Sequence, residues 1–215
     1  MATHMKIDFV SDVSCPWCVI GLRALEDAIT RLGPELEVEF EFQPFELNPQ
    51  MPAEGQNLDE HVMQKYGMSP TDTARNREAI RARGAELGFE FRMDKRDRIY
   101  NTFDAHRLLA WAVGEGRQRA LKYALFDAYF TRGENPGDHT VLLTAAESVG
   151  LDRLRAAAVL AGDEYAEEVR AREDFYHQHG IHAVPAIILN ERHLLQGGQP
   201  SEVFEQALRE IAAQA

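Results

Sequence analysis

Residues 11–18 read Ser11-Asp12-Val13-Ser14-Cys15-Pro16-Trp17-Cys18 and contain both cysteines of the chain. The short apolar-rich run that leads into them, residues 6–13, is typical of a buried strand. Apolar residues at helical spacing follow as far as Leu32, where Gly33-Pro34 predicts the end of a helix. Residues 36–43 then alternate between apolar and polar side chains, as in a half-buried strand. The stretch therefore predicts a βαβ unit with the cysteine pair at the start of its helix.

The spacing and position of the cysteine pair suit disulfide exchange. A helix N-terminus offers unpaired N–H donors and the positive end of the helix dipole, and both favour a thiolate. Thiols of Cys-X-X-Cys motifs can have pKa values of roughly 3.5–7.5, against about 8.5 for an unperturbed cysteine. Cys15 is therefore the expected exposed nucleophile, and Cys18, one turn inside the helix, the expected resolving thiol. Pro16 suits the first helical turn, where its missing N–H leaves no partner unsatisfied.

Two other interpretations of the cysteines stay open. They could bind zinc together with His177 and His182, which have four residues between them as in zinc fingers. The cysteines lie far upstream of these histidines, however, and flank a helix start. They could also be structural, although a disulfide that closes so small a loop constrains little of a chain of 215 residues. The redox interpretation is favoured, and no metal is expected.

Helical signals dominate residues 57–173. Ser69-Pro70 predicts a helix N-cap followed by proline at the first helical position, and this helix is expected to end near Leu87. Further helices are predicted over residues 103–113, 117–129, 140–149 and 154–161. Within this region residues 89–93 alone indicate a strand. We therefore expect a helical insertion domain over residues 57–173.

Strand signals return near the C-terminus. Residues 186–189 and 193–195 predict two short strands around a turn, and residues 200–213 predict an amphipathic helix with Val203, Leu208 and Ile211 on its buried side. Together with the N-terminal βαβ unit, these elements predict one discontinuous domain, residues 6–56 and 174–215.

The composition is that of an ordinary packed protein, with 45% apolar and 27% charged residues. The formal net charge of −12 disfavours nucleic-acid binding, which normally requires a basic patch. No apolar run approaches the roughly 20 residues needed to span a bilayer, and the first residues show no secretory signal. We therefore expect a cytoplasmic protein without nucleic-acid or membrane partners.

Four stretches resemble the thioredoxin superfamily, its DsbA branch and, within that branch, FrnE-like proteins. They are residues 11–18 quoted above; Pro44-Phe45-Glu46-Leu47-Asn48-Pro49; Asn101-Thr102-Phe103-Asp104-Ala105-His106-Arg107-Leu108; and Gly180-Ile181-His182-Ala183-Val184-Pro185 with Gly197-Gly198-Gln199-Pro200 behind it. These stretches occur in family order over nearly the whole chain. The resemblance implies an α/β, thioredoxin-like fold, in which helices flank a mixed sheet and a large all-helical insertion interrupts it.

The resemblance also implies a substrate groove beside redox-active Cys15 and Cys18. Pro16 and Trp17 are expected to form one wall of it. Taken alone, Val184-Pro185 would only begin a strand. In this family it is expected to be a cis-proline that faces the thiols, so that Val184 can pair with an extended substrate. The family match further makes Asn101 or His106 a groove candidate. A helix cap for Asn101 and a buried, hydrogen-bonded His106 are the open alternatives.

The sequence thus predicts an enzyme, a protein disulfide oxidoreductase that acts on a protein or a small thiol. No cofactor is expected, and glutathione stays open as a redox partner. The alternative is a glutathione-dependent isomerase or transferase, because 2-hydroxychromene-2-carboxylate isomerases and kappa-class glutathione transferases form a sister group. Those proteins have serine where this chain has Cys15, which favours dithiol chemistry here. A non-catalytic binding module is a third hypothesis.

Overall fold

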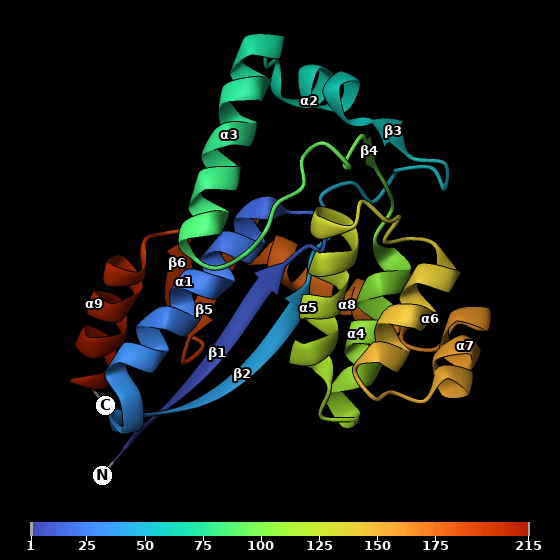
Figure 1. Ribbon diagram of the computed structural model, residues 1–215. Coiled ribbons are helices and arrows are strands. Elements are labelled where there is room, and N and C mark those ends of the chain that lie inside the picture. Colours follow the sequence, from blue (N-terminus) through green and yellow to red (C-terminus); the bar gives the residue numbers. More distant parts are fainter. Residues whose placement is uncertain (1, 215) are drawn as a thin grey trace.

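The computed structural model describes residues 2–214, which form a mixed sheet between helices (Figure 1). β1 (Thr3–Ser11) and β2 (Leu36–Pro44) run parallel. They are joined by α1 (Pro16–Leu32) and the short 3₁₀ turn η1 (Gly33–Glu35). The βαβ unit predicted around the cysteine pair is therefore present, and the pair lies at the N-terminal end of α1.

The sheet is completed by chain from the far end of the sequence. β5 (Ala186–Leu189) pairs antiparallel with β1, and β6 (His193–Gln196) pairs antiparallel with β5. The strand order is β2-β1-β5-β6. Phe9 of β1 lies opposite Phe42 of β2 and opposite Ile187 of β5. The centre of the sheet is therefore apolar and joins the two ends of the chain.

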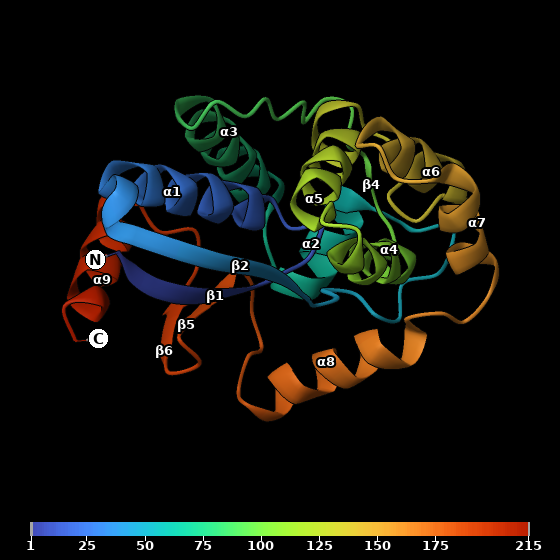
Figure 2. The ribbon, with the colours of Figure 1, turned by 90° about the horizontal axis from the view of Figure 1, so that it is seen from below.

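Helices cover both sides of the sheet. Figure 2 shows α1 and α8 (Ala166–Gln178) on opposite sides of β1 and β2. α9 (Ser201–Ala212) packs beside α1 and buries Phe204, Leu208 and Ile211. The expectation for Val203 is wrong, because this side chain is largely exposed and Phe204 takes the inward position. No helix within residues 2–214 is both long and apolar enough to cross a membrane.

The segment between the two halves of the sheet is mainly helical, as expected. Besides α8, its helices are α2 (Leu58–Tyr66), α3 (Pro70–Glu86), α4 (Phe103–Gly114), α5 (Gln118–Phe126), α6 (His139–Ser148) and α7 (Arg153–Ala161). α5 continues into a π-helical turn, η2 (Asp127–Thr131). α8 crosses the domain boundary predicted at residue 173, so the division into residues 57–173 and the rest stays a prediction.

Three local features differ from the sequence-based expectation. Residues 89–93 form no strand, and the insertion instead contains a two-residue ladder between β3 (Gln56–Asn57) and β4 (Arg98–Ile99). α2 and α8 were not predicted, because both helices are rich in charged residues and bury few apolar side chains. The capping signal of α2 was nonetheless present, since the Asn57 side chain accepts hydrogen bonds from the N–H groups of Asp59 and Glu60.

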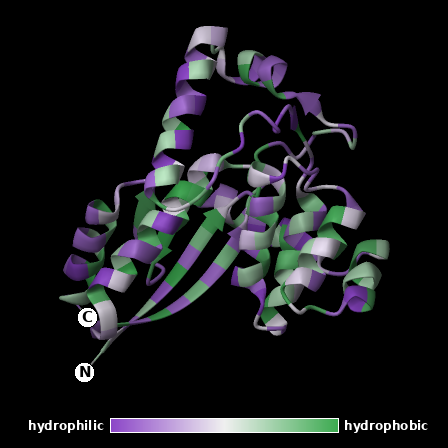
Figure 3. Ribbon diagram, viewed as in Figure 1, coloured by the Kyte–Doolittle hydropathy of each residue, from purple (hydrophilic) through white to green (hydrophobic). Residues whose placement is uncertain are grey.

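α3 extends away from the sheet and is mainly hydrophilic (Figure 3). Its buried residues are Ile80 and Gly84. Gly84 lets the segment after α3 approach closely, because a Cβ there would lie 2.9 Å from the Phe89 carbonyl oxygen and would overlap the buried Phe91 ring. This contact holds α3 against the 89–93 segment.

We expect Gly84→Ala to lower the free energy of unfolding by about 1–3 kcal/mol, because overpacking outweighs the gain in helix propensity. Urea unfolding measures this change. Gly114→Ala is the matched control, since a Cβ at Gly114, the last residue of α4, would meet no atom within 4 Å. Equal stability of the two variants would contradict the close packing of α3.

Candidate active site

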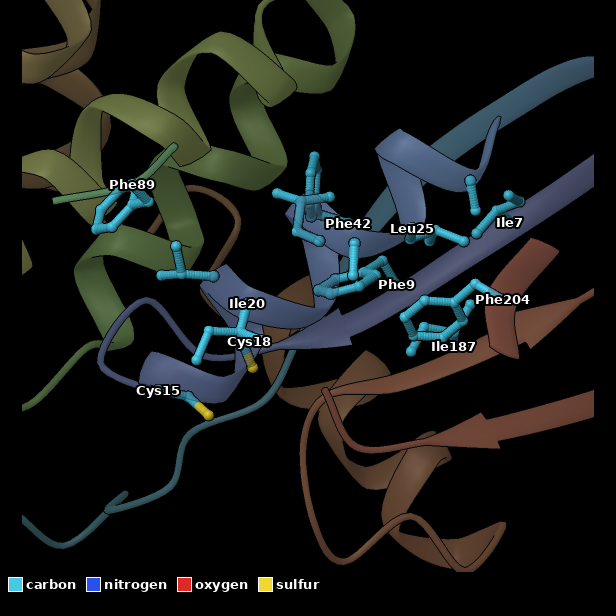
Figure 4. Packing of buried hydrophobic residues seen from close by; sticks show 14 of the residues in the cluster. Ile7, Phe9, Cys15, Cys18, Ile20, Leu25, Phe42, Phe89, Ile187 and Phe204 are labelled. Atoms are coloured by element: carbon cyan, nitrogen blue, oxygen red, sulfur yellow. The ribbon is translucent and has the colours of Figure 1, made fainter. Parts of the chain in front are cut away.

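The two thiols lie in the first turn of α1 (Figure 4). Cys15 is the N-cap residue, and the N–H of Cys18 donates to the Cys15 carbonyl oxygen at 3.1 Å. Both cysteines are free thiols. The expectation that Cys15 is openly exposed is wrong, because it is only 4% exposed, while Cys18 is 0% exposed. The two differ in what they border, since Cys15 lines a large cavity and Cys18 does not.

The loop before β5 closes against this turn. The Val184–Pro185 peptide bond is cis, and the Cys15 thiol donates to the Val184 carbonyl oxygen at 3.6 Å. Gly21 of α1 makes room for the loop, because a Cβ there would lie 3.0 Å from Pro185 Cγ. A Cβ on Gly198 would similarly lie 3.1 Å from the Trp17 carbonyl oxygen. Two glycines thus permit the close approach of both C-terminal loops to α1.

The cavity beside Cys15 has a volume of about 620 Å³. Its walls come from the start of α1, the 45–49 loop, α2, α3, the 93–99 segment and the 182–184 loop. Pro16, Trp17 and Val184 line it, together with Cys15. A volume of this size falls within the range of roughly 300–1,000 Å³ that is typical of small-molecule sites.

Asn101, His106 and Pro185 are not among the residues that line the cavity. The Asn101 side chain accepts from the Phe103 N–H at 2.9 Å and donates to Glu46 at 3.3 Å, so it secures the start of α4. His106 is buried on α4. Pro185 packs against α1, where its Cγ would lie 3.0 Å from a Cβ on Gly21. The structure therefore places Asn101 and His106 in supporting positions.

Asp12 links the end of β1 to the 45–49 loop. Its carboxylate accepts from the N–H groups of Ser14 at 3.1 Å and Leu47 at 2.7 Å, and His106 Nε2 lies 3.6 Å from it. Burial raises the pKa of Asp12, but His106 and the two N–H donors outweigh that effect, so the pKa is lowered. The carboxylate therefore remains ionised beneath the dithiol, where it also caps the loop.

Lys122 of α5 is a buried cation near the dithiol that the sequence did not reveal. Its side chain is fully buried, and its Nζ has no hydrogen-bond partner within residues 2–214. The Nζ lies over the rings of Phe42 and Phe126, at 5.6 and 5.3 Å from their centres. Burial lowers the pKa of Lys122 to about 8, although Cys18, Asp12 and Cys15 act in the opposite direction. No local motif marks such a lysine.

The zinc interpretation depends on His177 and His182, and these rings lie at the cavity wall with their centres 5.9 Å apart. Within residues 2–214 no three His, Cys, Asp or Glu side chains are grouped as metal ligands would be. With Cys15 at the wall of this cavity and Cys18 fully buried one turn further along α1, the arrangement can carry out thiol chemistry.

The chain is similar to known proteins over nearly its whole length. The model of the DSBA-like thioredoxin domain family matches residues 6–209. The chain is 34% identical to the probable DsbA oxidoreductase SCO1869 of Streptomyces coelicolor, with a TM-score of 0.91, covering 99% of this chain and 92% of that one. It is 28% identical to the uncharacterized protein YwbO of Bacillus subtilis, covering 97% of this chain and 96% of that protein.

A more distant structure has the same fold. The cytosolic disulfide reductase DsbM of Pseudomonas aeruginosa, solved with glutathione, is 18% identical, with a TM-score of 0.64, covering 95% of this chain and 98% of that one.

We expect iodoacetamide at pH 7.5 to alkylate Cys15 well before Cys18. Burial, followed by the hydrogen bond with Cys15, raises the pKa of Cys18 well above its usual value. Each unit by which a thiol pKa rises reduces the thiolate fraction about tenfold at a pH below it. Mass spectrometry of single-cysteine variants, Cys18→Ser and Cys15→Ser, gives the two rates separately. Equal rates would contradict the assigned roles.

The lowered pKa of Lys122 predicts a pH-dependent stability. Between about pH 8 and pH 10.5 the unfolded chain binds a proton that the folded chain has lost, so the free energy of unfolding rises with pH. We expect the free energy of unfolding of the protein with Lys122, relative to that of Lys122→Met, to rise by up to about 3 kcal/mol across this range. Urea unfolding in a Cys15→Ser/Cys18→Ser background, where no thiol titrates, measures it. A pH-independent difference would show that Lys122 titrates normally.

Proposed function

Because the chain belongs to the DsbA-like thioredoxin domain family, we propose that it is a dithiol–disulfide oxidoreductase acting through Cys15 and Cys18. The placement of the two thiols carries this proposal: Cys15 lines the cavity, and Cys18 is fully buried one turn further along α1. A substrate disulfide in the cavity therefore meets Cys15 first. Cytoplasmic localisation and membership of the FrnE-like subgroup stay predictions.

The exchange takes place in two displacements. The Cys15 thiolate attacks one sulfur of the substrate disulfide, forms a mixed disulfide, and releases the other sulfur as a thiolate. The Cys18 thiol then loses its proton and attacks the Cys15 sulfur, so that the Cys15–Cys18 disulfide forms and the second substrate thiolate leaves. The substrate gains two electrons and the protein loses them. The reverse sequence oxidises a substrate dithiol, and the compartment's redox potential sets the direction.

Lys122 supports the second displacement. Burial keeps Cys18 protonated, and a positive charge on Lys122 acts against this by lowering the pKa of the Cys18 thiol. With its own pKa lowered to about 8, Lys122 can also exist as a neutral amine near physiological pH. A positive charge on Lys122 therefore favours the Cys18 thiolate at the moment when Cys18 must attack.

The loop before β5 is suited to hold the substrate. Val184 lines the cavity next to Cys15, and its carbonyl oxygen is already within 3.6 Å of the Cys15 sulfur. A peptide-like substrate can pair its backbone with an edge of this kind, as in β-strand addition. This position would hold a disulfide directly over the nucleophile.

The glutathione-dependent isomerase or transferase remains the alternative. A bound thiol would then act as the nucleophile, and the chain would need no thiol of its own at position 15. The presence of both thiols in one helical turn therefore favours exchange. Thiol counting after mild oxidation with oxidised glutathione separates the two functions. Dithiol exchange removes two thiols per chain, whereas one glutathione adduct per chain would support the glutathione-dependent alternative.

We expect Cys18→Ser to accumulate a stable mixed disulfide with bis(2-hydroxyethyl) disulfide, because no thiol remains to resolve it. Intact-mass spectrometry should show the adduct on Cys15. The unmodified chain should instead end as an internal disulfide without added mass, and Cys15→Ser should form no adduct. Disulfide exchange that continues at the normal rate in Cys15→Ser would refute the mechanism.

A further inference from the structure

Arg96 is a buried cation at the wall of the Cys15 cavity. Its side chain is only 9% exposed. The guanidinium lies over the rings of Tyr129 and Phe130, at 4.8 and 5.1 Å from their centres. Arg96 Nε has no hydrogen-bond partner within residues 2–214, and the guanidinium is in no ion pair there. Stacking holds the plane of the guanidinium and leaves donors at its edge for another group.

An unpaired buried charge is unfavourable, and buried arginines are normally paired with an anion. Arginine keeps its charge in proteins, and its planar donors match the two oxygens of a carboxylate. The aromatic pair under Arg96 supplies no negative charge. The donors at its edge therefore fit an anion that enters from the cavity.

The other two long cations of the cavity are already engaged. Lys65 donates to the Leu47 carbonyl oxygen at 2.6 Å and to Asn48 at 2.8 Å, which ties α2 to the 45–49 loop. Arg77 is paired with Asp59. Among the cavity-lining lysines and arginines of the described residues, Arg96 alone has neither an ion pair nor a hydrogen bond to a carbonyl or carboxylate oxygen.

The cavity wall has more cationic than anionic side chains, although the chain is strongly acidic. Its described wall contains Lys65, Arg77 and Arg96 but a single carboxylate, Glu46, which is itself bound by Arg170. Burial lowers the pKa of His61, and the positive charges of Lys65 and Arg96 lower it further. The formal net charge of the whole chain is −12. The excess of cationic over anionic side chains at this wall is therefore opposite to the charge of the whole chain.

We propose that the cavity binds a low-molecular-weight disulfide whose carboxylate pairs with Arg96, an inference that rests on the proposed function. The cavity volume of about 620 Å³ suits a small ligand. Because Cys15 and Arg96 line the same cavity, we assign the disulfide of such a ligand to Cys15 and its acid group to Arg96. Cys15 then forms a mixed disulfide with one half of the ligand and releases the other half as a carboxylate-bearing thiolate.

Three symmetrical disulfides test this assignment: 3,3′-dithiodipropionate is anionic, bis(2-hydroxyethyl) disulfide is neutral, and cystamine is cationic. Their second-order rates with Cys15 are measured in the Cys18→Ser variant and divided by their rates with 2-mercaptoethanol, which removes intrinsic reactivity. We expect the anionic probe to exceed the neutral one by about tenfold or more, and the cationic probe to be slowest. Arg96→Met should abolish this preference and leave the neutral rate within about twofold.

Arg23→Met is the matched control. Arg23 also stacks on an aromatic ring, 4.6 Å from the centre of Tyr123, and its Nε is also buried without a partner, but it does not line the cavity. This variant should retain the preference for the anionic probe. Equal normalised rates for the anionic and neutral probes, or equal slowing of all three by Arg96→Met, would overturn the inference and leave the proposed function intact.

A second measurement needs no variant at Arg96, in case Arg96→Met does not fold. Adipate, a dicarboxylate without sulfur, should slow the reaction of the neutral disulfide with Cys15 in a saturable manner. Succinamide, which is uncharged, should not. No protection by adipate at millimolar concentration would overturn the carboxylate assignment, whereas failure of all three disulfides to react with Cys15 would refute the proposed function itself.

Discussion

The contact between the first turn of α1 and the loop before β5 is the constraint on which the site depends. It joins Cys15 to Val184, which are 169 positions apart in the chain. The antiparallel pairing of β1 with β5 brings the loop to α1, and Gly21 leaves space for Pro185 to pack there. The long helical segment between these elements must therefore leave the central sheet and return to it. The cavity forms where α2, α3 and residues 93–99 of that segment lie beside Cys15.

Much of the fold follows from local sequence patterns. The alternation in residues 36–43 corresponds to β2, and Ser69 caps α3 by accepting from the Asp72 N–H. The cysteine spacing likewise places both thiols at the start of α1, where the structure has them. α2 and α8 could not be found in this way, because they present few apolar residues and are held by charged contacts with distant parts of the chain. Periodicity detects a helix only when one of its faces enters a core.

The charges of the site escaped prediction for a related reason. Lys122 and Arg96 come from the inserted segment, and each is buried only because elements distant in sequence surround it. In the sequence, either residue reads as an ordinary solvent-exposed cation. Burial gives them their chemistry: it lowers the pKa of Lys122 to about 8 and leaves the Arg96 guanidinium without an ionic partner in the described chain. The inserted segment thus contributes Lys122 and Arg96 to the site, while the start of α1 carries both thiols.

We infer above all that Cys15 and Cys18 form one reversible two-electron redox pair. Equilibration of the protein in graded mixtures of reduced and oxidised glutathione, followed by acid quenching and thiol counting, tests it most directly. We expect the concerted loss of two thiols per chain, with a midpoint that depends on the square of the reduced glutathione concentration divided by the concentration of the oxidised form. A stable adduct of one glutathione per chain, or two thiols that persist under oxidising conditions, would contradict it.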